Sequence, residues 1–176
     1  MLQLNEFKVI FQRVCELNLL SGARLVTLNA ISENRLSTST FEGYIYIDSQ
    51  QVRLWVSLDR FFPLSLPIIF LKPFDALGFI PHIDKSGWVC YVQNEGLLCD
   101  RNNPVGIIRD ALLRTRQLLL DGLNQKNRQD FLDEFEFYWR QLGNVQHLDF
   151  FISLGNKPKR IIAKKLNDKN IAINDC

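Results

Sequence analysis

The sequence predicts an α+β fold: an N-terminal helix, a four-stranded antiparallel meander sheet, a loop that carries a histidine and a cysteine, and C-terminal helices. Apolar residues recur at three- and four-residue steps near the N-terminus and again after residue 103, as in amphipathic helices. Between residues 24 and 71, β-branched and aromatic residues alternate with polar ones, as in strands with one covered face. His82 and Cys90 stand between these two regions, eight positions apart.

A chain of 176 residues with 47% hydrophobic and 23% charged residues has the composition of a soluble globular protein that forms its core without disulfides. No apolar run approaches the length of a membrane span, and the N-terminus lacks the basic flank and apolar core of a signal peptide. We therefore expect a cytoplasmic protein with no membrane partner.

The four cysteines stand at positions 15, 90, 99 and 176 without a Cys-x-x-Cys pair, and only two histidines accompany them. Because zinc sites need ligands at short, regular spacings, we expect no metal, no other cofactor and no structural disulfide. The net charge is +2, but six basic residues fall between residues 156 and 170 against one acidic residue. This basic tail lacks interleaved aromatic residues, so a solvated or partner-binding segment is favoured over a nucleic-acid site.

The first helix is predicted from about Leu4 to Leu20, with Gly22 as its C-terminal stop. Three strands follow at residues 24–31, 41–47 and 52–58. A meander is the simplest topology for them, because consecutive strands usually lie side by side.

Residues 61–67 contain two prolines, which forbid a helix and remove backbone donors, so this segment is expected to be an extended link. It leads into a fourth strand at residues 68–71. Further along, Asn103 and Pro104 have the residue types preferred at the start of a helix, and Gly122 is placed to end that helix.

A second C-terminal helix is expected over residues 127–142, with Asp130 as a capping partner in its first turn. Residues 149–154 have the composition of a short strand, and the last ten residues look frayed. The predicted division is a main domain, residues 1–145, and a C-terminal extension, residues 146–176, that carries the basic tail.

The turn-forming Asp-Lys-Ser-Gly segment can bring His82 and Cys90 to the same side of their loop. A thiol in that arrangement can attack an activated carbonyl, and an imidazole can carry protons or charge. The alternative is packing, because free cysteine is among the most buried residue types and the apolar and aromatic neighbours of Cys90 also suit a core strand. Spacing alone does not decide between these roles.

The order of the elements and four spaced motifs resemble the ubiquitin-conjugating enzyme (UBC) fold. In that family a Tyr-Pro-x-x-Pro-Pro segment leads through a strand to His-Pro-Asn, and the catalytic cysteine follows eight residues after the Asn, preceded by Gly-x-Ile or Gly-x-Val. The matching segments of this chain are Phe62–Pro67, Ile80–His82, Gly87–Cys90 and, at a helix start, Asn103–Ile108. The resemblance covers roughly residues 4–142.

The chain departs from the common pattern in having His82 in place of the Asn, and Tyr91 after the cysteine in place of Leu-Asp. Together with the Asp-Phe-x-x-Glu-Phe-x-x-Tyr-Trp run from Asp130 to Trp139, these departures are similar to the prokaryotic branch called family B. Some members of that branch belong to CBASS anti-phage operons. The resemblance implies a transferase that forms a thioester on Cys90 with the C-terminus of a ubiquitin-like modifier or of a CD-NTase (cGAS-like) protein.

The resemblance also implies an adenylating activating enzyme, as a separate chain or a lost fusion partner, because no Gly-x-Gly-x-x-Gly nucleotide loop is present, and a protein amine as acceptor. His82 would donate a hydrogen bond to the oxyanion or take a proton from the amine, or it would only hold the loop in place. Asp84 and Asp100 are candidate amine-orienting carboxylates, although turn chemistry explains both. Two alternatives stay open: a catalytically inactive UBC-like binding module, and a cysteine peptidase with His82 or His147 as its base.

Overall fold

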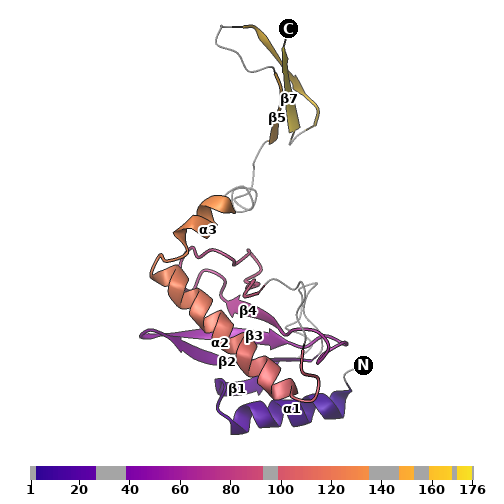
Figure 1. The fold of residues 1–176 in the computed structure, drawn as a ribbon, viewed down its shortest axis with the longest axis vertical. Coiled ribbons are helices and arrows are strands. Elements are labelled where there is room, and N and C mark those ends of the chain that lie inside the picture. Colours follow the sequence, from indigo (N-terminus) through magenta and orange to yellow (C-terminus); the bar gives the residue numbers. More distant parts are fainter. Residues whose placement is uncertain are drawn as a thin grey trace. The chain divides into compact units, whose positions relative to one another are not determined.

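The computed structural model describes residues 3–26, 39–92, 99–134, 147–152, 159–167 and 170–175. The chain forms two compact units, residues 1–133 and 134–176. In the first unit the helix α2 (Pro104–Leu123) lies across one face of a four-stranded sheet and contacts the N-terminal helix (Figure 1).

The sheet has the predicted meander order β1-β2-β3-β4, with antiparallel pairing between neighbours. Its strands are β1 (Ser21–Leu25), β2 (Thr40–Ile47), β3 (Gln50–Ser57) and β4 (Ile68–Lys72). The α+β class and the four-stranded antiparallel sheet are therefore confirmed. The first strand begins earlier than predicted, and most of the rest of the predicted 24–31 segment lies outside the described residues.

The first helix, α1 (Leu4–Glu16), buries the apolar face predicted for it: Phe7, Ile10 and Val14. The ring of Phe11 lies 5.6 Å from the ring of Phe41 in β2, so the helix packs on the sheet. The prediction that this helix reaches Leu20 is wrong. The chain leaves the helix after Glu16, and Asn18 adopts a left-handed φ of 49°, a conformation that asparagine tolerates well.

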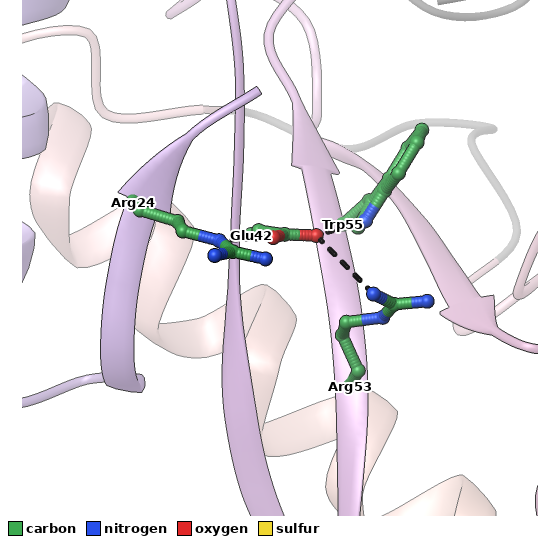
Figure 2. Close-up of polar contacts among 4 residues, drawn as sticks. All are labelled: Arg24, Glu42, Arg53 and Trp55. Atoms are coloured by element: carbon green, nitrogen blue, oxygen red, sulfur yellow. Dashed lines mark hydrogen bonds and ion pairs between the residues drawn. The ribbon is translucent and has the colours of Figure 1, made fainter. Parts of the chain in front are cut away.

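Alternation along the strands separates two faces of the sheet. The core face carries the buried apolar residues Phe41, Ile45, Ile47, Val52, Leu54, Val56, Ile69 and Leu71. The opposite face is organised around Glu42, whose side chain is almost fully buried. Its Oε1 accepts a hydrogen bond from Arg24 Nε at 2.5 Å, and its Oε2 accepts one from Trp55 Nε1 at 2.5 Å. Figure 2 shows this carboxylate between β1 and β3, with Arg53 Nη1 4.0 Å from Oε2.

The link before β4 is a compact turn rather than the extended segment that its prolines predict. Asp59 Oδ1 accepts hydrogen bonds from the backbone N–H groups of Phe61 and Phe62, at 2.8 and 3.0 Å. The same oxygen accepts one from Ser65 Oγ at 2.5 Å. One carboxylate thus closes the turn, and the chain enters β4 as predicted.

The start of α2 is as predicted, because Asn103 Oδ1 accepts a hydrogen bond from the backbone N–H of Gly106 at 2.9 Å. Its end differs, since Gly122 lies inside the last turn rather than after it. A Cβ at Gly122 would stand 2.3 Å from Ile80 Cγ2. The glycine therefore allows α2 to pack closely on the segment that precedes His82.

The next helix, α3 (Arg128–Asp133), begins where the second C-terminal helix was predicted. The predicted capping pair is not formed: Asn127 Oδ1 is buried without a hydrogen bond, and the Asp130 carboxylate lies against His82 instead. Residues 135–146, which include the rest of the predicted helix, lie outside the described residues.

The second unit contains a three-stranded sheet in the order β5-β7-β6. Its strands are β5 (His147–Phe151), β6 (Ile161–Lys165) and β7 (Asn170–Asp175), with β7 parallel to β5 and antiparallel to β6. The prediction of frayed terminal residues is wrong for β7, which is the central strand and buries Ala172 and Ile173. The division into residues 1–145 and 146–176 stays a prediction. None of the described helices is long and apolar enough to cross a membrane.

Candidate functional site

The loop that carries Cys90 continues the sheet beyond β4. The backbone N–H of Leu71 donates to the carbonyl of Gly87 at 2.7 Å, and that of Val89 donates to the carbonyl of Ile69 at 2.9 Å. Phe70 and Trp88 form an antiparallel bridge between these bonds. Residues 87–89 are therefore attached to the sheet as a short extra strand.

A second row of backbone bonds holds the other side of this extra strand. The N–H of Asp84 donates to the carbonyl of Trp88 at 3.1 Å, and the N–H of Cys90 donates to the carbonyl of His82 at 2.8 Å. Ile83 and Val89 form an antiparallel bridge in the same row. The backbones of His82 and Cys90 thus lie opposite each other, so the structure places together the two residues that the sequence singled out.

The turn between them is formed by Asp84 and Gly87. Asp84 Oδ1 accepts hydrogen bonds from Ser86 N at 2.8 Å, Ser86 Oγ at 2.5 Å and Trp88 N at 3.0 Å. Gly87 has a left-handed φ of 85°, and a Cβ there would stand 2.2 Å from the carbonyl oxygen of Leu71. Only glycine fits this position, because both the backbone conformation and the contact with β4 exclude a side chain.

The candidate carboxylates Asp84 and Asp100 both serve turns. Asp84 is engaged as described, and Asp100 Oδ1 accepts a hydrogen bond from Asn102 N at 3.1 Å, two residues along. Asp100 also lines a hollow of about 260 Å³ together with Tyr91 and Cys99. These hydrogen bonds of Asp84 and Asp100 match the turn chemistry that explains both carboxylates without a catalytic role.

Lys72 joins the turn to the outer face of the sheet. Its Nζ donates to the carbonyl of Ser86 at 2.9 Å and lies 5.1 and 5.3 Å from the ring centres of Trp55 and Phe70. Its positive charge thus lies at the end of β4, next to the loop that carries Cys90.

Cys90 is partly exposed and lines a hollow of about 160 Å³ formed by residues 66–68 and 88–92. Its Sγ lies 3.9 Å from the carbonyl oxygen of Val92. Tyr91 donates a hydrogen bond from its hydroxyl to the carbonyl of Pro67 at 2.6 Å, and burial raises the pKa of Tyr91 well above its usual value. The protonated phenol therefore joins the two segments that form the hollow.

His82 has a left-handed φ of 66°, a conformation that is uncommon for residues other than glycine and concentrated at functional sites. Its side chain is 22% exposed, and its Nε2 lies 3.2 Å from Oδ2 of Asp130 in α3. Sequence reasoning missed this partner, because Asp130 is 48 positions away and reads as a helix cap. The second histidine, His147, belongs to β5 of the other unit.

Residues 23–148 match the family described as prokaryotic E2 family B, and this segment contains the whole loop with His82 and Cys90. The comparison with curated proteins finds no similar sequence. Because the match covers well over half of the chain, and because the fold is the α+β arrangement expected of an E2, the chain belongs to prokaryotic E2 family B.

Proposed function

We propose that this protein is a ubiquitin-conjugating-like acyl carrier and transferase whose Cys90 forms a thioester. The observation that carries the proposal is the position of Cys90: it is partly exposed in a hollow, and the strand it follows is held by backbone hydrogen bonds on both sides. A nucleophile works best when its approach to the carbonyl is fixed in advance. The E2 family supplies the class of reaction.

The reaction has two balanced steps. In the first, the Cys90 thiolate attacks the carbonyl carbon of a thioester on an activating enzyme, a new C–S bond forms to Cys90, and the partner's sulfur leaves as a thiolate. In the second, an amine nitrogen attacks the Cys90 thioester, a C–N bond forms, and the C–S bond breaks. The amine gives up one proton, and Cys90 returns to its thiol state.

The proposed partners are those that the family resemblance implies. An adenylating activating enzyme supplies the thioester, and the acyl group is the C-terminus of a ubiquitin-like modifier or of a CD-NTase protein. A lysine or other amine of a target protein accepts it. We place the reaction in the cytoplasm and, by the resemblance stated above, in bacterial anti-phage defence of the CBASS kind.

Intact-mass analysis and non-reducing gels test the proposal with the protein purified together with the products of its neighbouring genes and ATP. We expect a thiol-labile adduct on the wild type, none on Cys90→Ala, and a thiol-stable ester on Cys90→Ser. Cys15→Ser is the control for cysteine loss in general, since Cys15 is also partly exposed but lies on α1, and it should keep the adduct. An adduct that persists on Cys90→Ala would show that another residue carries the acyl group.

A cysteine peptidase is the second candidate, because the contact between His82 and Asp130 supplies the third group that such an enzyme needs. Incubation with a peptide thioester and with the corresponding peptide amide separates the possibilities. A conjugating enzyme reacts only with the thioester, a peptidase also cleaves the amide, and a binding module reacts with neither. Family membership leads us to expect reaction with the thioester alone.

A further inference from the structure

We infer that Asp130 is a positioning residue that fixes the protonation pattern of His82 so that its Nδ1 accepts a proton from the incoming amine. The inference rests on the proposed function and deepens it, because it selects one of the three roles that the sequence left open for His82. It assigns a role to a carboxylate of α3 that lies outside the loop carrying Cys90.

The geometry that carries the inference is the contact of 3.2 Å between His82 Nε2 and Asp130 Oδ2. An ionised carboxylate only accepts hydrogen bonds, so the ring nitrogen that faces it must carry a proton. A neutral imidazole has one N–H, and with that proton on Nε2 the other ring nitrogen, Nδ1, has the lone pair. Neutral His82 in this contact is therefore a proton acceptor at Nδ1 and cannot donate from Nδ1 to an oxyanion.

The backbone from which the imidazole projects is held by the neighbouring strand. The carbonyl of His82 accepts from the N–H of Cys90, and the residue that follows, Ile83, is bridged to Val89. The backbone at His82 is thus held in its left-handed conformation on the strand side, while Asp130 holds the ring on the helix side. Proton transfer then proceeds from the amine nitrogen to His82 Nδ1 as the C–N bond forms, and the Cys90 sulfur leaves with the electron pair of the C–S bond.

Discharge kinetics test the inference. The protein is acylated at Cys90 with a peptide thioester and then mixed with either lysine, whose amine must lose a proton, or 2-mercaptoethanol, whose thiolate does not. We expect Asp130→Asn to slow lysine discharge by roughly tenfold to a hundredfold and to leave thiolate discharge within about twofold of the wild type. Asp121→Asn is the matched control, because Asp121 is a carboxylate near the end of α2 that contacts Gln117 and Lys126.

A double-mutant cycle separates positioning from a general structural effect. If Asp130 acts through His82, the variant that carries both His82→Asn and Asp130→Asn discharges lysine no more slowly than His82→Asn alone. Asp130→Glu, which keeps the charge, restores part of the lost rate. Multiplied effects in the double variant, or equal slowing with both nucleophiles, would overturn the inference.

Nitrogen NMR of the imidazole rings reads the protonation pattern without any activity. The chain contains two histidines, so His147→Gln assigns the ring signals of the ¹⁵N-labelled protein. We expect neutral His82 to carry its proton on Nε2 in the wild type and to lose that preference in Asp130→Asn, while the His147 signals do not change. A proton on Nδ1 in the wild type refutes the inference. If the wild type is never acylated by the thioester, the proposed function fails, and the NMR result still decides whether Asp130 sets the state of His82.

Discussion

Replacing Gly87 by alanine gives the sharpest test of how the Cys90 loop is held. An alanine at this φ of 85° costs about 1–2 kcal/mol in left-handed strain, offset by about 0.4–1 kcal/mol from the lower entropy of the unfolded chain. In addition, its Cβ would stand 2.2 Å from the Leu71 carbonyl oxygen, so the loop must move away from β4. That movement breaks the hydrogen bonds Leu71 N to Gly87 O and Val89 N to Ile69 O, at about 0.5–1.5 kcal/mol each.

Gly78 provides a matched control, because its φ of 76° imposes the same strain while a Cβ there meets nothing within 4 Å. We expect Gly78→Ala to lower the free energy of unfolding by about 1 kcal/mol or less, and Gly87→Ala to lower it by roughly 2–4 kcal/mol. Urea denaturation followed by circular dichroism measures both. The thioester yield on Cys90 should also fall in Gly87→Ala alone. Equal losses of stability in the two variants would refute the argument that contact with β4 fixes the loop.

Three further predictions concern the rest of the first unit. Glu42→Gln should lower the free energy of unfolding by about 1–3 kcal/mol in urea denaturation, since its buried carboxylate accepts bonds from Arg24 and Trp55; an unchanged midpoint would contradict this. Asn103→Ala should lower the melting temperature, at a cost of about 1 kcal/mol, while Asn103→Ser should keep most of the stability. Burial raises the pKa of Tyr91 above the unfolded-state value of about 10. The stability that depends on the protonated phenol is therefore fully present below about pH 10 and is lost as the pH rises toward the folded-state pKa. Alkaline unfolding of Tyr91→Phe should therefore show a weaker pH dependence than that of the wild type.

The parts of the fold that the sequence predicts correctly depend on short-range signals. Asn103 caps α2 because a side-chain oxygen three residues before an N–H can reach it in almost any context. The strands around Glu42 and Trp55 alternate between faces because the period of two belongs to the backbone itself. Short-range signals also predict the turn from Asp84 to Gly87, because its residue types favour turns.

The parts that it misses depend on contacts between distant segments. Glycine commonly ends helices, so the sequence predicts a stop at Gly122. The close approach of Ile80 instead requires a glycine inside the helix, and only the tertiary packing reveals this contact. The strand β7 has an unremarkable sequence and gains its order from pairing with strands on both of its sides. Asp130 looks like a cap, and its contact with His82 is a tertiary one.

The backbone at position 82 explains why a histidine can stand where related conjugating enzymes have an asparagine. The left-handed φ of 66° restricts this position to residues that tolerate it, and asparagine, aspartate and histidine are the side-chain-bearing residues most enriched in that conformation. The backbone conformation at this position therefore suits both asparagine and histidine. They differ in chemistry, because an amide side chain donates hydrogen bonds but does not titrate near neutral pH, whereas an imidazole does. The exchange is thus permitted by conformation, and the carboxylate of Asp130, 3.2 Å away, gives the histidine a partner suited to its N–H.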